Sequence, residues 1–403
     1  MQDVVIIGSG IVGMTLANAL ARNGRKFVVI DAVSKPAFDP DRYDPRVSAI
    51  GRAAERIFLN LGAWPAISGK RISPFRNMVV WDAGSAGVIS FDAANIGESH
   101  LGHIIENNLM VESLHRTLDE YRNGIVLWNT EVLEIIPGSD SVTIKTRNEV
   151  FTTRVLVGAD GSSSWVRNQL GIETQGLDYE QRAIVAQVHT ELPHEHTAWQ
   201  RFLPTGPLAF LPLADGSCSI VWSCDLPFAD ELLQLNDSAF VQRLAESFEY
   251  RLGQITQIGP RKWFPLHRAH ADSYITNRCA LIGDAAHTIH PLAGQGVNLG
   301  IADAAALSQV ILDATAVGKD IGSRSVLRRY ERWRKGENAL MLSAVHGLYR
   351  LFQIRSTPAR QLRGIGLQVT NRSGPMKRAI VRRAMGLTGD LPDLAKPQTW
   401  VDT

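Results

Sequence analysis

The sequence predicts an α/β fold: a parallel sheet built from separated parts of the chain, an inserted mixed β-sheet and a helical C-terminal region. β-branched runs typical of buried parallel strands occur at residues 4–7, 151–157 and 279–282, and each leads into a glycine-containing turn. Between residues 183 and 223, polar and apolar residues alternate as they do in antiparallel strands. These observations predict two different sheets within one chain.

A β-α-β unit opens the chain, with a strand at 4–7, a helix at 14–23 and a strand at 27–30. A helical pattern follows at 46–61. Further strands are predicted at 79–81, 87–91, 124–128, 142–146, 183–190, 199–203, 208–212 and 217–223, and further helices at 109–121 and 296–314. We expect residues 1–174 and 271–335 to form one α/β domain, 175–270 an inserted sheet domain joined by strands near 75–105, and 336–403 a basic helical region.

Length and composition are those of an ordinary globular protein. The 403 residues are 45% hydrophobic and 20% charged, with a formal net charge of +2. The three cysteines are too few for a disulfide framework and lack metal-ligand spacing, so we expect reduced thiols and no metal site. The apolar run at 4–21 lacks the basic flank and cleavage pattern of a signal peptide, so we expect a cytoplasmic protein.

The first glycine motif, Gly8-x-Gly10-x-x-Gly13, lies between a predicted strand and a predicted helix. Its glycines permit a tight turn and bring backbone N–H groups close to a pyrophosphate at the helix N-terminus. Asp31 ends the second strand and is placed to accept hydrogen bonds from a ribose diol. The motif predicts a dinucleotide site and does not separate FAD from NAD.

Two later strands also end in a turn that combines glycine with an acid. Asp160 follows Gly158, a pattern that on its own is equally typical of an Asx turn. Asp284 follows Gly283 and is placed to accept hydrogen bonds from a polyol chain. The loop at 294–296 then opens a helix and can present N–H groups to an electron-rich ring edge.

Together these segments resemble the class A flavoprotein monooxygenases, which share the fold of para-hydroxybenzoate hydroxylase. The run from His290 to Asp303, HPLAGQGVNLGIAD, is similar to the signature of the ubiquinone-biosynthesis hydroxylases, which oxidise polyprenylphenols. Residues 44–50, 102–107 and 206–213 also resemble that family, and the likeness covers nearly the whole chain. The resemblance implies that 1–174 and 271–335 form an FAD-binding Rossmann-like domain and that 175–270 bind the substrate.

The resemblance implies that one set of residues surrounds FAD, from its ADP half to its flavin ring. The first glycine motif and Asp31 would hold the ADP half, and Arg46 would lie near the pyrophosphate. Asp284 would bind the ribityl region, and Asn107 would lie near the flavin. Asp160 would lie where FAD and the nicotinamide donor are both sensed. The full cofactor set is Gly8, Gly10, Gly13, Asp31, Arg46, Asn107, Asp160, Asp284, Gly294, Gln295, Gly296 and Asn298.

The resemblance also implies the chemistry: NAD(P)H reduces FAD, and the reduced flavin reacts with O2 to give a C4a-hydroperoxide that hydroxylates a phenol ring. Such chemistry needs a pocket that excludes water rather than a nucleophile. Pro291 would pack near the flavin. His287 and His290 are candidate acid–base groups, but structural or flavin-adjacent roles are favoured because the sequence shows no positioned partner. Candidates for the substrate pocket, with ordinary sheet core as the alternative, are Trp199, Phe210, Trp222 and His267.

The C-terminal region is basic. Residues 338–389 contain nine basic residues and no acidic residue, interleaved with apolar residues such as Leu362 and Ile365. This composition fits an anionic membrane surface, where a polyprenyl substrate resides, and equally a solvated helix face packed on the core. The charges come without a nucleic-acid motif, so we expect no nucleic-acid partner. The family resemblance also implies a complex of ubiquinone-biosynthesis proteins.

Other functions fit the same sequence. A class A hydroxylase of a soluble phenolic or polyketide aromatic would have the same fold, as would a reductase of prenyl chains or a non-catalytic flavin-fold scaffold. A flavin-dependent halogenase is disfavoured, because residues 221–227 do not match the Trp-x-Trp-x-Ile-Pro motif expected of that class.

Overall fold

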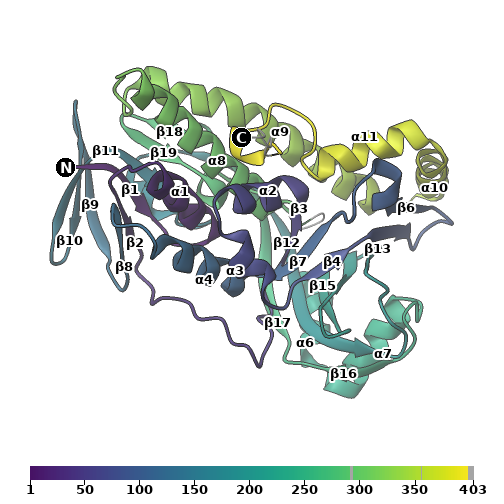
Figure 1. Cartoon of the computed structure of the whole chain (residues 1–403). Helices are drawn as coiled ribbons and strands as arrows, with labels where there is room; N and C mark the ends of the chain where they lie inside the picture. The colour runs from purple at the N-terminus through teal and green to yellow at the C-terminus, as the bar shows by residue number, and fades with distance from the viewer. Residues whose placement is uncertain (291–293, 355, 398–403) are drawn as a thin grey trace, which may run out of the picture.

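The computed structural model describes residues 1–290, 294–354 and 356–397, which form two large sheets and one small sheet joined by helices (Figure 1). The first large sheet has the strand order β18–β19–β11–β1–β2–β8, and β10 and β9 continue it from β11 as antiparallel strands. Its strands are β1 (Gln2–Ile7), β2 (Phe27–Ile30), β8 (Gly124–Leu127), β9 (Val132–Pro137), β10 (Val142–Thr146), β11 (Val150–Gly158), β18 (Ile275–Thr276) and β19 (Cys279–Leu281).

Helix α1 (Ile11–Arg22) covers this sheet and packs against α4 (Asn107–Leu118) and α8 (Gly296–Ala316). The central strands are buried on both faces, which explains their continuous β-branched sequences. By length and composition alone α8 could cross a membrane, but most of it is buried inside the fold, as in the core helix of a globular protein.

The second large sheet has nine strands in the order β20–β17–β12–β15–β14–β13–β5–β6, with β16 beside β12. β5 and β13 pair in parallel, and the other pairs are antiparallel. The strands are β5 (Asn77–Asp82), β6 (Val88–Asp92), β12 (Thr174–Thr190), β13 (Thr197–Leu203), β14 (Gly206–Pro212), β15 (Cys218–Asp225), β16 (Ile255–Ile258), β17 (Lys262–Ala271) and β20 (His287–Thr288).

The small sheet has the order β3–β7–β4 and lies between the large sheets, while α10 and α11 lie beside β6 at the end of the molecule far from the N-terminus (Figure 1). These remaining elements are β3 (Val47–Gly51), β4 (Ser73–Phe75), β7 (Gly102–Glu106), α2 (Arg52–Asn60), α3 (Trp64–Ser68), α5 (Trp165–Gln169), α6 (Leu226–Gln234), α7 (Asp237–Ser247), α9 (Arg324–Gln353), α10 (Thr357–Arg372), α11 (Gly374–Ala384) and the 3-10 turns η1 (Ala93–Ile96), η2 (Gly283–Ala285) and η4 (Asp393–Ala395).

The two faces of the nine-stranded sheet meet different partners. Ile184 and Trp222 point into a core completed by α6 and α7. Their chain neighbours Ala183 and Val221 point to the other face and pack with Tyr349 of α9, because side chains alternate along a strand. The sheet therefore separates an ordinary hydrophobic core from a face that meets α9.

The α/β fold class predicted from the sequence is confirmed, and one predicted element is wrong. Residues 47–51, expected to begin a helix, form β3, and α2 begins only at Arg52. The apolar residues at 47 and 50 fit a helical period, but β3 pairs with β7 along its whole length, and this long-range pairing decides the local structure. The three cysteines are free, as expected, and all three are buried.

Candidate functional site

The three glycine-containing turns meet at one edge of the parallel sheet. β1, β11 and β19 run in parallel, and Gly158 is in register with Ile7 on one side and Leu281 on the other. The turns that follow these strands therefore leave the sheet at the same end. A Cβ placed on Gly8 would lie 2.3 Å from the Ala159 carbonyl oxygen, so the first two turns touch.

The first turn leaves the N-terminus of α1 open. Gly8 has a φ of +106°, which favours glycine, and a Cβ on Gly13 would lie 2.0 Å from the Gly8 carbonyl oxygen. A Cβ on Gly10 would meet no atom of the part of the chain that the structure describes within 4 Å. Among the described residues no side chain caps α1, and its first turn contains no acid. An uncapped helix N-terminus that follows such a glycine turn is the arrangement that binds a phosphate group.

Asp31 lies beside this turn, where a ribose could be held. Its Oδ2 accepts hydrogen bonds from the Ser9 backbone N–H at 2.7 Å and from Ser9 Oγ at 2.5 Å, and its Oδ1 accepts one from the Val33 N–H. Asp31 is therefore held beside the first turn by Ser9 of the glycine motif.

Asp160 in the second turn accepts hydrogen bonds from Ser164 Oγ at 2.5 Å and from the Val166 N–H at 3.0 Å. Such local hydrogen bonds are typical of an Asx turn, the alternative interpretation of this motif. The Asp160 side chain is partly exposed. Arg167, which the sequence analysis did not single out, donates to the carbonyl oxygens of Ser162 and Ala285 and so joins the second turn to the third.

Asp284 lies in the third turn and part of its surface is exposed. Protein atoms packed around its carboxyl group displace water from it, and this desolvation raises its pKa. His267 lies close enough to act in the opposite direction and favour the ionised carboxylate. Gly283 beside it has a φ of +60°, and a Cβ there would lie 3.1 Å from Val12 Cγ2. The third turn is therefore packed against the start of α1, which completes the convergence of the three turns.

Asn298 joins the N-terminus of α8 to strand β3. Its Nδ2 donates to the carbonyl oxygens of Ala49 at 2.8 Å and Gly294 at 3.1 Å, and its Oδ1 accepts from the Gly51 N–H. Gly294 has a φ of +59°, and a Cβ there would lie 3.1 Å from Ala49 Cβ. Gln295 and Gly296 form the boundary from which α8 begins.

Asn107 and Arg46 lie on the opposite side of β3. Asn107 Oδ1 accepts a hydrogen bond from Ser48 Oγ at 2.7 Å, and its backbone N–H donates to the Arg46 carbonyl oxygen. The Arg46 side chain is exposed, with its guanidinium 4.5 Å from the centre of the Phe264 ring. Strand β3 thus carries predicted cofactor residues or their partners along both of its edges.

His290 lies between the nine-stranded sheet and α9. It is 1% exposed, and its Nε2 is 3.2 Å from Gln181 Oε1. Its ring lies 4.9 Å from the Tyr179 ring and 5.3 Å from the Tyr349 ring, and burial lowers its pKa to about 4. Nδ1 has no hydrogen-bond partner within the described part of the chain. Pro291, predicted beside the flavin, lies outside the described residues.

The aromatic residues predicted to line a substrate pocket lie mostly elsewhere. Phe210 and Trp222, 1% and 0% exposed, belong to the core under α6 and α7, and Trp199 packs against that same core. Their placement favours the sheet-core alternative. His267 in β17 is partly exposed and near Asp284, so it is the candidate of this group that lies at the turns.

Two buried polar groups were not found from the sequence. One links His287, Asp303 and Arg334 behind the third turn. The other brings Glu55 of α2 together with His100 and His103. The His-x-x-His spacing was its only sequence signal, and it is weak because Glu55 lies far away in the chain.

The model of the FAD binding domain family (FAD_binding_3) matches residues 1–343. Ubiquinone biosynthesis monooxygenase COQ6 of Danio rerio is 36% identical, with 94% of this chain and 88% of that protein covered. 3-Demethoxyubiquinol 3-hydroxylase of Escherichia coli K12 is 35% identical, with 96% and 98% covered. Ubiquinone hydroxylase UbiL of Rhodospirillum rubrum is 36% identical, with 96% and 90% covered.

The fold has close counterparts among solved structures. p-Nitrophenol 4-monooxygenase PnpA from Pseudomonas putida DLL-E4 superposes with a TM-score of 0.79 at 19% identity, with 96% of this chain and 98% of that one covered. PqsL of Pseudomonas aeruginosa gives 0.77 at 22% identity, with 92% and 100% covered. Identities this low establish the fold alone.

Fold, converging turns and family match together define an FAD-dependent monooxygenase. The open space at Gly10 and the uncapped N-terminus of α1 fit the phosphates of that cofactor. Within this class, the chain belongs to the family of ubiquinone-biosynthesis hydroxylases, as its sequence resemblance implied.

Proposed function

We propose that this protein hydroxylates the aromatic ring of a polyprenylphenol intermediate of ubiquinone biosynthesis, with FAD as cofactor, O2 as oxygen donor and NAD(P)H as reductant. The observation that carries the proposal is the convergence of the three glycine-containing turns at one sheet edge. The substrate class is supported by relatives of 35–36% identity whose names refer to ubiquinone hydroxylation.

In this proposal FAD supplies the redox chemistry, activating O2 so that one oxygen atom is transferred to an electron-rich ring. The chain binds and orients it. We place the pyrophosphate over Gly10 at the N-terminus of α1, and the adenosine ribose at Asp31. The ribityl chain would meet Asp284, and the flavin edge the loop at 294–296 that Asn298 braces against β3. Arg46, Asn107 and Asp160 belong to the same proposed set.

We place the substrate ring on the face of the nine-stranded sheet that meets α9. The residues there that support this placement are apolar or aromatic, as a water-excluding site requires: Tyr179, Ala183, Val221, Leu266 and Tyr349. His290 is uncharged at neutral pH, because burial lowers its pKa to about 4. Its Nδ1 can then accept a hydrogen bond from a phenol hydroxyl, while Pro291 is proposed to lie next to the flavin.

We also propose that α10 and α11 dock on the cytoplasmic surface of an anionic membrane. Leu362, Ile365 and Val369 form an apolar stripe on α10 and are 70%, 57% and 57% exposed. A pocket of about 110 Å³ between β6, the end of α10 and α11 includes Arg372, Lys377 and Arg378 in its lining, together with Asp92 and uncharged residues. Exposed apolar side chains flanked by basic ones are what a membrane interface attracts.

One basic residue of this region serves the fold instead. Arg363 is buried, forms two hydrogen bonds of 2.9 Å with the carboxylate of Asp82 in β5, and donates to the Leu351 carbonyl oxygen. It therefore holds α10 in place and presents the apolar stripe outward. A complex with other ubiquinone-biosynthesis proteins is the second proposed partner for the same stripe.

Turnover by the purified, FAD-loaded protein tests the proposal. With NADH or NADPH and a short-chain prenylphenol, we expect O2 uptake and a product heavier by one oxygen atom, with little turnover of a phenol that lacks the prenyl chain. Efficient hydroxylation of the unprenylated phenol would instead support the soluble-substrate alternative. In a third outcome the protein binds FAD but turns over neither phenol, while deletion of its gene still causes a quinone precursor to accumulate. That combination would indicate a non-catalytic scaffold.

A further inference from the structure

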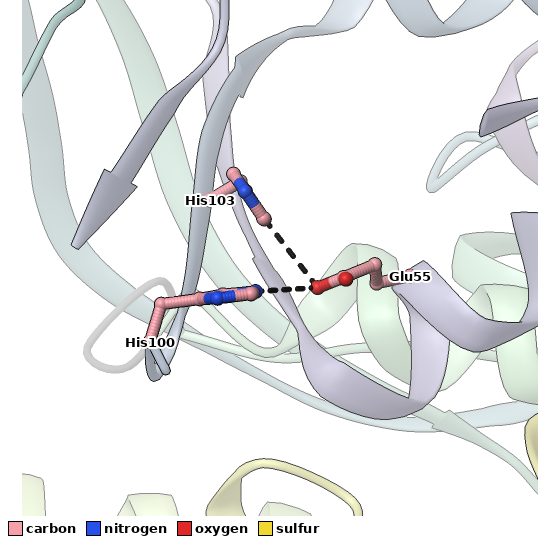
Figure 2. Close-up of side chains that lie close together, drawn as sticks. All are labelled: Glu55, His100 and His103. Carbon is pink, nitrogen blue, oxygen red and sulfur yellow. Dashed lines mark hydrogen bonds and ion pairs between the residues drawn. The ribbon is translucent and has the colours of Figure 1, made fainter. Parts of the chain in front are cut away.

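A buried cluster of potential metal ligands lies away from the proposed flavin site. Glu55 comes from α2, His103 from β7, and His100 from the loop just before β7; Figure 2 shows both imidazole rings beside the Glu55 carboxylate. Glu55 Oε2 is 2.8 Å from His100 Nε2 and 3.4 Å from His103 Nδ1. Glu55 and His103 are 6% and 7% exposed, whereas the His100 side chain is 14% exposed, so two of the three ligands are buried and the third is partly exposed.

His103 directs an unsatisfied nitrogen at this cluster. Its Nδ1 is buried and has no hydrogen-bond partner within the described part of the chain. At 3.4 Å its contact with Glu55 is longer than an ordinary hydrogen bond between nitrogen and oxygen. A buried polar atom without a partner is unfavourable, so this nitrogen lacks a ligand that would satisfy it.

The surroundings of His100 lead to the same point. Ser99 Oγ lies 2.8 Å from Nδ1, and Arg52 Nη1 lies 2.6 Å from Nε2. Since a guanidinium can only donate, Nε2 must offer Arg52 a lone pair, but a lone pair there also faces Glu55 Oε2 at 2.8 Å. A proton on Nε2 would satisfy Glu55 and leave the Arg52 N–H pointing at another hydrogen. A cation between the ligand atoms removes this conflict.

We propose that Glu55, His100 and His103 bind one Zn²⁺ ion, with water as the fourth ligand. Two imidazole nitrogens and one carboxylate oxygen are a zinc ligand set, and they disfavour Mg²⁺ and Ca²⁺, which prefer oxygen. Bonds of about 2.0–2.2 Å in a tetrahedron separate the ligand atoms by roughly 3.3–3.6 Å. The three ligand atoms already lie within 4.8 Å of one another, so only small side-chain movements are needed.

Arg52 competes with the metal for His100 Nε2 and for the Glu55 carboxylate, whose Oε1 lies 2.5 Å from Arg52 Nη1. Its Nε bonds Glu98 at 3.1 Å, and the guanidinium can turn toward that carboxylate when zinc binds. The site joins the first turn of α2 to the strand that leads directly into Asn107. A bound ion would therefore brace the antiparallel pair β3–β7, on which part of the proposed flavin site is built.

Metal analysis of the full-length, FAD-containing protein tests this inference without relying on activity. After treatment with EDTA and dialysis against ZnCl2, the wild type should retain about one equivalent of zinc and gain thermal stability. CoCl2 should produce the visible d–d absorption of a tetrahedral site. His103→Gln should weaken zinc binding at least about tenfold, whereas the matched variant His189→Gln should bind as the wild type does.

Arg52→Gln keeps all three ligands and removes the competing cation, so it should bind zinc more tightly than the wild type. This variant also separates loss of the site from misfolding in a ligand variant. A wild-type protein that retains no zinc under these conditions would overturn the proposal and leave a charge network in its place. Equal zinc binding by His103→Gln would overturn it as well.

Discussion

His287 Nε2 and Asp303 Oδ2 lie 2.5 Å apart, and neither side chain has any exposed surface. Asp303 also accepts hydrogen bonds from Arg334 at 2.8 Å and from the Gly283 backbone N–H at 3.2 Å. Burial opposes ionisation of Asp303, but His287 and Arg334 outweigh it and lower its pKa to about 2. The pair thus holds the third turn against α8 with a charged group inside the protein.

Replacing Asp303 by asparagine should lower the free energy of unfolding by about 3–5 kcal/mol, because the Arg334 charge is left buried without a carboxylate partner. Asp313 is a matched control on the same helix, since its ion pair with Arg329 is about half exposed. Asp313→Asn should cost less than about 1 kcal/mol. Urea unfolding at pH 7 measures both, and equal effects would contradict a central role for the buried pair.

Substitution of Gly10 should separate cofactor binding from folding. A Cβ at this position meets no atom of residues 1–290, 294–354 or 356–397 within 4 Å, so Gly10→Ala should fold normally. If the pyrophosphate lies there, the variant should lose FAD affinity by at least about tenfold, or 1.4 kcal/mol. Gly336→Ala, also in open space but in α9, is the control. Flavin absorbance per chain measures the FAD that each variant retains. Full FAD retention by Gly10→Ala would mean that the pyrophosphate does not bind at Gly10.

Buried histidines should make the fold sensitive to mild acid. Burial and, secondarily, Lys35 lower the pKa of His115 to about 4, and burial does the same for His290. Between pH 6.5 and 4 the unfolded chain therefore binds more protons than the folded one. The free energy of unfolding should fall with pH in this window, by up to about 1.4 kcal/mol per pH unit for each histidine.

His115→Gln tests this pH dependence. The variant should show a shallower fall of unfolding free energy between pH 6.5 and 4, whatever its stability at pH 7. His196→Gln, at an exposed position, should keep the slope of the wild type. A slope that does not change in His115→Gln would mean that other groups set the acid response.

Trp222 should matter for stability and not for substrate binding. Because its side chain is buried in the core under α6 and α7, Trp222→Leu should lower the free energy of unfolding by roughly 2–4 kcal/mol. KM for a prenylphenol should not change. Steady-state kinetics and urea unfolding on the same preparation decide the point, and a raised KM with normal stability would restore Trp222 to the substrate pocket.

The apolar stripe of α10 should control membrane binding. Leu362→Glu with Ile365→Glu should reduce co-sedimentation with phosphatidylglycerol vesicles at least about tenfold, since both charges would enter the interface. Leu133→Glu with Ile136→Glu adds the same charge at side chains of β9 that are 51% and 41% exposed, and should bind as the wild type does. If the α10 variant binds vesicles as the wild type does, the stripe does not bind membrane and a protein partner is its remaining proposed role.

Local sequence was sufficient for the cofactor motif and for most elements. Gly8 and Gly13 occupy positions where a Cβ would collide with backbone atoms, and α8 begins at Gly296 as predicted. Strand β3 could not be predicted in this way, because its apolar spacing suits a helix and only pairing with β7 makes it a strand. Long-range pairing is invisible to a local pattern.

The sequence by itself determined the fold class, the flavin motifs and the resemblance to a hydroxylase family, because each depends on short patterns of residues that are close together in the chain. The tertiary structure alone decided which face of the nine-stranded sheet each aromatic residue occupies, sending Trp222 to the core and Tyr179 toward His290. It alone also brought Glu55 to His100 and His103. Such groups form when segments far apart in the sequence pack together, and the spacing of residues along the chain does not show that they will be close in space.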